Sequence, residues 1–449
     1  MFGSTTSMHG VADGSLGQGG VDGMANLHDR LAAKIPIWRD ELHDLVKNHG
    51  DKVISQVTVA QALGGMRGVK GMICDTSEVP PERGLLIRGI PLADLTGHTP
   101  EDIFYLLCTG DLPGDAARED LRAELARRAR VPRYVWQVLE SLPPQSHPMC
   151  MLDTAVLAMQ GESRFVQAYH EGVARNELWR SMLEDCLTLL ARMPTIAAGI
   201  YRLRFRKGDP IEPDPALDYS SNFAHMLGLR DLHAEAADAL RLYLVLHCDH
   251  EGGNVSAHTC SLVGSALSDA YYSVSAGLNG LSGPLHGLAN QECLSWVLEV
   301  RDQFGGVPTE AQLRQFAWDT LNSGRVIPGY GHAVLRVTDP RFTALLEFGK
   351  AHFPQDEIVQ LVARVFEVVP KVLEEQGKAK NPWPNVDAAS GAVLHHYGMT
   401  EFSYYTVMFS VSRTMGMCAQ LIWNRAMGMP IERPKSVTYA WLKQQVSGA

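Results

Sequence analysis

Segments that favour the α-helix recur along most of this 449-residue chain. Residues 234–250 combine strong helix formers with apolar side chains at helical spacing, which is typical of a helix with one buried face. Residues 309–322 begin with Thr309 and carry Gln312 three positions later, the pattern of a capping box. These signals predict a chain built mainly from helices.

Two further helix boundaries are visible in the sequence. Asp339 followed by Pro340 predicts a capping residue and then a proline in the first helical position. Residues 358–375 form an amphipathic helical pattern that ends at Gly377. Pro370 lies inside that pattern, so we expect it to kink the helix or to split it.

Strand signals are scarce. Residues 53–63 carry some β-branched side chains, and residues 84–92 have the pattern of a small hairpin. The sequence has neither alternating strand and helix patterns nor a glycine-rich phosphate loop after a strand. We therefore predict an all-α fold without a central sheet.

Composition argues against several classes of protein. The chain is 45% hydrophobic and 20% charged, as soluble globular proteins are, and its formal net charge of −10 argues against a nucleic-acid-binding surface. The apolar stretch at 404–423 contains Arg413, and a charge in lipid is costly, so we expect a buried core helix without membrane insertion. The closest of the eight cysteines, Cys248 and Cys260, are twelve residues apart, which predicts buried free thiols and no zinc site.

The first 26 residues hold seven glycines and neither Lys nor Arg. This composition matches neither a secretory signal nor an Arg-rich transit peptide. We expect a flexible leader over residues 1–30.

Turn-rich segments indicate how the rest of the chain is divided. Residues 206–218, with three prolines and four acidic residues, read as a surface loop. The stretches at 280–288 and 377–392 bracket a block of helices that we interpret as a smaller domain inserted in a larger one, with the chemistry in a cleft at its edges. The predicted boundaries are 31–286 with 399–449 for the large domain and 287–398 for the small domain.

Four short stretches carry histidines, glycines or a well-placed carboxylate. They are HEGGNVSAH at 250–258, PLHGLANQE at 284–292, PGYGHAVLR at 328–336 and NPWPNVDAASG at 381–391. Histidines beside glycine-rich turns, together with one fixed carboxylate, are what an enzyme that transfers protons needs. The combination, more than any one stretch, predicts such an enzyme.

His286 precedes an apolar run that begins at Leu288, so we expect it at a helix N-terminus. The positive end of a helix dipole favours the neutral form of an imidazole. A neutral imidazole can donate a hydrogen bond to a carbonyl oxygen, which suits the stabilisation of an enol or enolate. The alternative is that His286 only caps the helix.

His332 lies in a loop with Gly324, Gly329 and Gly331, whose backbone freedom would let the loop approach a nucleotide base or a pantetheine arm closely. A tight turn without a ligand is the alternative.

Asp387 follows Pro382 and Pro384, which would hold its carboxylate in a fixed direction. A carboxylate is a plausible base for a C–H proton when it is desolvated and aligned. The alternative is an N-cap for a helix that begins near Ser390.

Three arginines complete the pattern. Arg341 lies at a predicted helix start, Arg413 is embedded in an apolar segment, and Arg433 lies in the PIERPKS tail. A buried guanidinium needs an anionic partner, and three of them suit a small dicarboxylate. Ordinary internal salt bridges are the alternative.

With these motifs in this order, the sequence closely resembles the citrate synthase family in its eukaryotic, mitochondrial-type branch. The resemblance runs from Arg67 in MRGVKG to RPKS at Arg433. It implies an almost entirely α-helical homodimer with a large and a small domain in each subunit and a shared active site. It also implies an acyltransferase that condenses acetyl-CoA with oxaloacetate and hydrolyses citryl-CoA to citrate and CoA, without cofactor or metal, in the mitochondrial matrix.

The resemblance further implies roles for individual residues. Asp387 would remove a methyl proton from acetyl-CoA, His286 would hydrogen-bond the thioester oxygen, and His332 would polarise and protonate the oxaloacetate carbonyl. The oxaloacetate pocket matches His250, Asn254, Arg341, Phe409 and Arg413, with Arg433 from the other subunit. The coenzyme A site matches Arg67, Arg175, Val326, Gly329, Tyr330, Gly331, Arg336, Lys380 and Asn385.

Three alternatives to this function stay open. A 2-methylcitrate synthase would use the same mechanism with propionyl-CoA, and one methylene discriminates by only about 1–3 kcal/mol. A metal-dependent hydrolase would need a site built from His247, His250 and His258, whose spacing is not that of a familiar zinc site. A catalytically inactive helical binding protein is disfavoured because all three catalytic side chains are retained.

Overall fold

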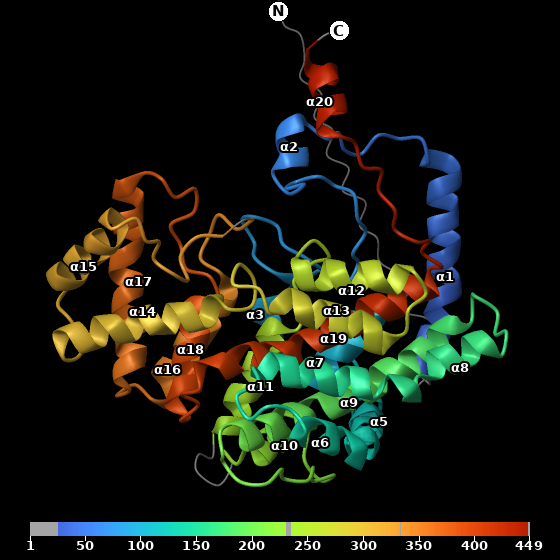
Figure 1. Cartoon of the computed structure of the whole chain (residues 1–449), viewed down its shortest axis with the longest axis horizontal. Coiled ribbons are helices and arrows are strands. Elements are labelled where there is room, and N and C mark those ends of the chain that lie inside the picture. Colours follow the sequence, from blue (N-terminus) through green and yellow to red (C-terminus); the bar gives the residue numbers. More distant parts are fainter. Residues whose placement is uncertain (1–25, 230–234, 333, 448–449) are drawn as a thin grey trace, which may run out of the picture.

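The computed structural model describes residues 26–229, 235–332 and 334–447, and most of these residues lie in α-helices (Figure 1). The strands of this part of the chain are β1 (Ser77–Glu78), β2 (Leu86–Ile87) and β3 (Ile90–Pro91), which pair antiparallel in the order β1-β2-β3. The predicted all-α fold is confirmed, and β2 and β3 form the predicted small hairpin.

The helices follow one another along the chain with short connections. The first are α1 (Leu27–His49), α2 (Val59–Leu63), α3 (Leu92–Leu95), α4 (Pro100–Thr109), α5 (Asp115–Arg128), α6 (Arg133–Glu140), α7 (Pro148–Ala158), the 3₁₀ turn η1 (Gln160–Glu162), α8 (Arg164–His170) and α9 (Leu178–Arg204). Next come α10 (Tyr219–Leu227), α11 (Ala236–His247), α12 (Val255–Ser265) and α13 (Ala270–Leu281). The last are α14 (Ala289–Phe304), α15 (Glu310–Asn322), α16 (Pro340–His352), α17 (Glu357–Gln376), α18 (Asp387–His396), η2 (Phe402–Tyr404), α19 (Tyr405–Ala426) and α20 (Tyr439–Val446).

Helix α19 lies inside the larger group of helices, where it packs along α9 and against α12 and α13 (Figure 1). Nearly all of its side chains are buried, including that of Arg413. The prediction of a buried core helix at 404–423 is therefore confirmed. Over the described residues, no helix combines the length and the apolar character that a membrane crossing requires.

Most of the predicted helix boundaries are confirmed. Thr309 and Gln312 form a capping box at the start of α15, and Asp339 caps α16. Helix α17 ends at Gly377, which has φ +70°. Pro370 does not split α17, so that half of the expectation is wrong, and a kink at Pro370 stays a prediction. The valines around it are buried, and their packing holds the helix together although one backbone N–H is missing.

Three expectations need adjustment. Residues 59–63 are helical, because a capping box between Thr58 and Gln61 starts α2 within the segment that carries β-branched side chains. Helix α11 ends at His247 rather than at residue 250, and residue 234 lies outside the described residues. The leader predicted over 1–30 lies outside the described residues as far as residue 25, whereas residues 27–30 already belong to α1.

Helices α14 to α18 form the group on the left of Figure 1 and pack mainly against one another. Helix α16 also contacts α3 and α11 of the larger group. The motif at 284–292 leads into α14, and the motif at 381–391 leads into α18. The division at residues 287 and 398 stays a prediction, but both motifs lie at the edges of this group.

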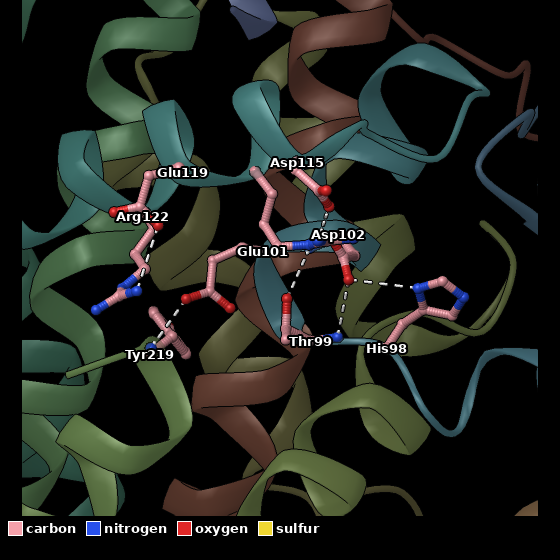
Figure 2. Close-up of polar contacts among 9 residues, drawn as sticks. His98, Thr99, Glu101, Asp102, Asp115, Glu119, Arg122 and Tyr219 are labelled. Carbon is pink, nitrogen blue, oxygen red and sulfur yellow. Dashed lines mark hydrogen bonds and ion pairs between the residues drawn. The ribbon is translucent and has the colours of Figure 1, made fainter.

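Figure 2 shows how buried acidic side chains hold the start of α4. Thr99 and Asp102 form a capping box, and Nε of Arg118, from α5, donates to Asp102 at 2.5 Å. Glu101, which is 2% exposed, accepts the backbone N–H of Tyr219 in the first turn of α10 at 2.9 Å. These carboxylates therefore join α4 to α5 and to α10.

A small, half-open pocket lies beside Glu101, between side chains of α5, α9 and α10. Its walls include Arg122, Leu125, Pro194 and Met226. None of the side chains predicted to act on a substrate lines it, so this pocket is separate from the candidate site.

Candidate active site

His286 lies just before α14, as its position in the sequence predicts, and is partly buried. Its Nε2 accepts the backbone N–H of Ser256 at 3.4 Å and lies 2.9 Å from the Ser256 hydroxyl oxygen. Burial, and then the positive charge of Arg413, lower the pKa of His286 to about 4. The ring is therefore neutral at pH 7, with its proton on Nδ1. The neutral form was expected from the helix dipole, whereas burial is the largest cause in the structure.

His332 is also held as a neutral imidazole. Its Nδ1 accepts the backbone N–H groups of Val334 at 3.0 Å and Leu335 at 2.9 Å, so the proton of the neutral ring lies on Nε2. Burial and the positive charge of Arg341 lower the pKa of His332 to about 4. Both histidines can thus donate one hydrogen bond to a ligand without being strong acids.

The loop that carries His332 pairs with the segment that leads to Asp387. Tyr330 and Pro384 form an antiparallel β-bridge, and the backbone N–H of Asn385 donates to the carbonyl of Gly329 at 2.9 Å. The Asn385 side chain donates to the carbonyl of the residue just before His332 at 3.0 Å. Two motifs that lie about 50 residues apart are thereby held side by side.

Gly329 explains the close fit of this pairing. It has φ +78°, and a Cβ at this position would lie 2.7 Å from Sγ of Cys293 and 3.1 Å from Cα of Ala388. Only glycine has both the backbone freedom and the space required here. The loop consequently packs directly on the first turn of α18, next to Asp387.

Asp387 is the first residue of α18. The N-cap position of α18 is held by Val386, so the alternative that Asp387 is an N-cap is wrong. Its backbone N–H donates to the side-chain oxygen of Asn385 at 3.0 Å. Burial raises the pKa of Asp387 from 3.8 to about 6, although the charge of Arg341 opposes the increase. A desolvated carboxylate of this kind is suited to act as a general base.

Arg413 is 1% exposed and lies over the ring of Phe409, with Cζ 4.7 Å from the ring centre. Its Nη1 donates to Oδ1 of Asn254 at 3.2 Å and to the hydroxyl of Ser256 at 3.4 Å. Among the described residues it forms no ion pair with a carboxylate, so the internal salt bridge proposed as an alternative is absent there. A ligand carboxylate could take that place.

Arg341 is 5% exposed and does have a protein partner, because its Nη2 and Nε donate to the carboxylate of Asp339 at 2.7 and 3.0 Å. Asp339 also caps α16, so one carboxylate starts the helix and orients the guanidinium. The salt-bridge alternative is correct for this arginine, although its charge still acts on His332 and Asp387.

His250 lies beside His332, with ring centres 5.5 Å apart. Its Nε2 is buried and has no hydrogen-bond partner among the described residues. Burial, and then Arg341 and Arg413, lower its pKa, so the ring is neutral. A buried polar atom without a partner costs stability, so this Nε2 is available to bind a ligand. The residues that the structure brings together, called the site cluster below, are His250, Asn254, His286, His332, Arg341, Asp387, Phe409 and Arg413.

The residues matched to the coenzyme A site divide into two sets. Val326, Gly329, Tyr330 and Gly331 lie in the loop that ends at His332, next to the segment of Lys380 and Asn385, and Arg336 follows them. Val326, Arg336 and Lys380 are exposed, and Arg336 donates to backbone carbonyls of its own loop. This set borders the site cluster.

Arg67 and Arg175, the other arginines matched to the coenzyme A site, are not held at the site cluster. The same is true of Arg433, which was matched to the oxaloacetate pocket. Arg67, Arg175 and Arg433 are exposed, and within the described part of the chain none of their side chains makes a hydrogen bond or ion pair with the site cluster. Arg67 follows α2, Arg175 precedes α9, and Arg433 follows α19.

No group of three or more His, Cys, Asp or Glu side chains among the described residues could hold a metal ion. The Nδ1–H of His247 donates to the carbonyl of Tyr243, and His258 pairs with Glu432. All eight cysteines are free, as predicted. Cys150 is exposed, however, so the prediction that the thiols are buried is wrong for this residue.

Sequence reasoning did not assign Ser256, Asp339 or Asp249 to the site. Ser256 contacts both His286 and Arg413, and its place two residues after Asn254 in HEGGNVSAH was the available signal. Asp339 was predicted only as a cap. Asp249 precedes the same motif and gave no signal, because its partners are about 170 residues away.

The chain matches one protein family over most of its length. Residues 65–435 match the model described as citrate synthase, C-terminal domain. The chain is 49% identical over 428 residues to "Citrate synthase 4, mitochondrial" of Arabidopsis thaliana, covering 93% of this chain and 90% of that protein. It is 50% identical over 421 residues to "2-methylcitrate synthase, mitochondrial" of Yarrowia lipolytica, covering 91% of this chain and 90% of that protein.

A solved structure supports the same assignment. The crystal structure of citrate synthase from Pyrobaculum aerophilum is similar with a TM-score of 0.76 at 27% identity, covering 86% of this chain and 95% of that chain. Sequence and fold thus agree over the same region. The chain belongs to the citrate synthase family.

Proposed function

We propose that this protein condenses acetyl-CoA with oxaloacetate and hydrolyses the resulting citryl-CoA to citrate and CoA. The observation that carries this proposal is a buried carboxyl group with a pKa of about 6, on the segment that pairs with the loop of His332, together with two imidazoles that burial keeps neutral. Such a carboxyl group is a stronger base than an ordinary Asp and is still ionised at neutral pH. Membership of the citrate synthase family supports the same activity.

In the first step, Asp387 removes a proton from the methyl carbon of acetyl-CoA, and the electron pair of that C–H bond forms the enol double bond. The Nδ1–H of His286 donates a hydrogen bond to the thioester oxygen, where negative charge develops. In the second step, the enol carbon attacks the carbonyl carbon of oxaloacetate, and His332 gives its Nε2 proton to the carbonyl oxygen. Water then cleaves the thioester and releases citrate and CoA.

Oxaloacetate is a dianion, and the site cluster offers matching charge. Arg413 and Arg341 are buried guanidinium groups, and Arg413 has no carboxylate partner in the described residues. The Nε2 of His250 is also without a partner there. We propose that the two carboxylates bind to these arginines and that His250 and Asn254 orient the substrate.

We further propose a homodimer in which the partner subunit supplies Arg433 to the site. An arm formed by the α2 region and the segment with α20 projects at the top of Figure 1. It carries exposed apolar side chains, including Ile54 (73%), Leu63 (70%) and Tyr439 (68%). Exposed apolar surface of this kind is typical of an interface, and a second copy of the chain would cover it.

Mixing two inactive variants tests the shared site. A dimer of one Arg433→Ala and one Asp387→Gly protomer would contain one site with both residues intact, so it should regain roughly half the wild-type activity. The measurement is turnover of purified heterodimers carrying two different tags. Heterodimers as inactive as either parent would contradict the contribution of Arg433 across the interface.

A 2-methylcitrate synthase activity is the second candidate, because a relative of that name is 50% identical. The two substrates differ by one methylene, which a pocket distinguishes only weakly. A thiol-release assay with oxaloacetate and either acetyl-CoA or propionyl-CoA decides between them through kcat/KM. A higher kcat/KM for propionyl-CoA would replace the primary proposal, and no turnover with either would overturn both.

We propose the mitochondrial matrix as the location, because close relatives carry names that include mitochondrial. Protease protection of the tagged chain in isolated mitochondria, with and without rupture of the inner membrane, tests this location. We also propose catalysis without a metal, so activity should be the same before and after treatment with EDTA.

A further inference from the structure

Asp249 is a fully buried carboxylate just outside the site cluster, in the loop of residues 248–254 between α11 and α12. Its Oδ2 accepts hydrogen bonds from the hydroxyls of Thr76 at 2.5 Å and Ser77 at 2.8 Å. Its Oδ1 accepts from Nε2 of Gln420, on α19, at 2.9 Å. The carboxylate therefore ties three separate segments of the chain together.

The directions of these hydrogen bonds match an ionised carboxylate. The hydroxyl oxygen of Ser77 accepts the backbone N–H of Glu251 at 2.7 Å, which leaves the Ser77 proton for Asp249. The hydroxyl of Thr76 lies 3.3 Å from Sγ of Cys74, and burial raises the pKa of that thiol to about 11. Cys74 can therefore donate to Thr76, which donates in turn to Asp249. Burial raises the pKa of Asp249, and these donors and Arg413 oppose the increase.

The same loop packs closely against α19 beside Arg413. Gly416, three residues after Arg413, donates its backbone N–H to the carbonyl of Cys248 at 3.1 Å. A Cβ at Gly416 would lie 2.5 Å from Oδ1 of Asp249, so glycine is required for this approach. Arg413 itself donates to the carbonyl of His247 at 3.3 Å and to Asn254 at 3.2 Å, the two ends of the loop.

Local backbone preferences alone do not account for the conformation of this loop. Glu251, which follows His250, has φ +54°, a conformation that residues other than glycine rarely adopt. The bond from its backbone N–H to Ser77 fixes it, and Ser77 is fixed by Asp249. The side chain of Asn254 closes the loop by donating to the carbonyls of His250 and Glu251 at 2.8 and 2.9 Å.

We propose that Asp249 is a positioning residue for oxaloacetate. Its hydrogen bonds fix the loop that carries His250 and Asn254. Its negative charge offsets the buried positive charge of Arg413, and the guanidinium stays free to bind a substrate carboxylate. This inference rests on the proposed function, since it names a residue that acts through the binding groups of the same site.

The test is Asp249→Asn, which keeps the size of the side chain and removes its charge. We expect the KM for oxaloacetate to rise at least about 10-fold, because the loop and Arg413 are both less well held. The KM for acetyl-CoA at saturating oxaloacetate and the kcat should stay within about 3-fold of wild type. A residue with only a structural role would change the melting temperature without this selective change in KM.

Asp185→Asn is the matched control. Asp185 is 1% exposed and accepts hydrogen bonds from the Ser163 hydroxyl and from the backbone N–H of Arg164, both at 2.6 Å. It lies in α9 and has no hydrogen bond to the site cluster among the described residues. This variant should lose stability and keep the wild-type KM for oxaloacetate.

Thr76→Val is a second, milder test if Asp249→Asn does not fold, because valine has the shape of threonine and lacks only the hydroxyl that donates to Asp249 and lies beside Sγ of Cys74. It should raise the KM for oxaloacetate about 3-fold. A wild-type KM in a folded Asp249→Asn protein, or in Thr76→Val when the first is unfolded, overturns the inference. If the wild-type protein turns over oxaloacetate and acetyl-CoA in the same assay, the proposed function stands, and only the positioning role of Asp249 is overturned.

Discussion

Two clusters of buried charge in this molecule differ in how their groups are paired. At the start of α4, Asp102 is bonded by the Arg118 side chain and by the backbone N–H of Thr99, both close in sequence (Figure 2). In the site cluster, Arg413 has no carboxylate partner and the Nε2 of His250 has no hydrogen-bond partner among the described residues.

This difference separates charges that serve folding from charges that serve binding. A buried charge or polar atom without a partner destabilises the folded chain. In the α4 cluster (Glu101, Asp102 and Arg118), local contacts offset that cost at Asp102, although Oε2 of Glu101 is also buried without a hydrogen-bond partner among the described residues. We therefore propose that the carboxylates of a dianionic ligand supply the partners that are missing in the site cluster.

The strongest test of the comparison removes the proposed base. Asp387→Gly should lower kcat at least about 100-fold, because the general base is lost. Steady-state turnover with both substrates at saturation measures this change. Asp356→Asn is the control on the same group of helices, since Asn can still cap α17, and its kcat should be close to wild type. If Asp387→Gly keeps activity within a few-fold of wild type, Asp387 is not the base.

A pair of identical substitutions contrasts the two clusters directly. Arg413→Lys should raise the KM for oxaloacetate at least about 10-fold, since an ammonium cannot form the two parallel bonds of a guanidinium. Arg118→Lys in the α4 cluster should leave that KM unchanged. Equal effects of the two substitutions on KM would show that the distinction between the clusters is wrong.

The pH dependence of the reaction tests the charge states of the site. Asp387 must be ionised to act as a base, and its pKa is about 6, so activity should be lost as the pH falls through 6. At pH 5 the kcat/KM for acetyl-CoA should be about 10-fold below its value at pH 7. His286 and His332, with pKa values of about 4, stay neutral over this range and do not account for the loss. A profile that is flat down to pH 5 would contradict the raised pKa.

The smallest effect is expected at Glu101. Burial raises the pKa of Glu101 above its ordinary value, so the folded state binds this proton more tightly than the unfolded state does. The neutral form therefore favours folding at low pH, and this contribution is lost as the pH rises through the folded-state pKa. Glu101→Gln should raise the melting temperature at pH 8, with a difference that shrinks towards pH 4, and should leave kcat/KM unchanged. A clear loss of activity would link the α4 cluster to the site.

Features that depend on neighbours in sequence were the predictable ones. The capping box of Thr309 and Gln312 and the helix end at Gly377 need contacts only a few residues long, and both are as predicted. Pro370 shows the limit of such reasoning, because burial of the surrounding valines outweighs the local preference to break the helix. The catalytic motifs were recognisable because each is short and contiguous.

Features that depend on distant contacts were not predictable. Burial, and not the helix dipole, is the main cause of the low pKa of His286, and burial depends on the whole fold. Ser256 meets His286 across 30 residues, and Asp249 meets Thr76 across 173. The reading of Asp387 as a cap failed because α18 already begins at Asp387, and the backbone N–H groups of Ala389 and Ser390 donate to the carbonyl of Val386.

The bridge between Tyr330 and Pro384 has a mechanical consequence. It clamps His332 and Asp387 to a common backbone, whereas His286 and Arg413 are anchored through Ser256 at the start of α12. Any relative motion of the two helix groups must carry the first pair as one rigid unit. Under the proposed mechanism, a movement between the two helix groups would change the distance from Asp387 to His286 and would keep the spacing between Asp387 and His332.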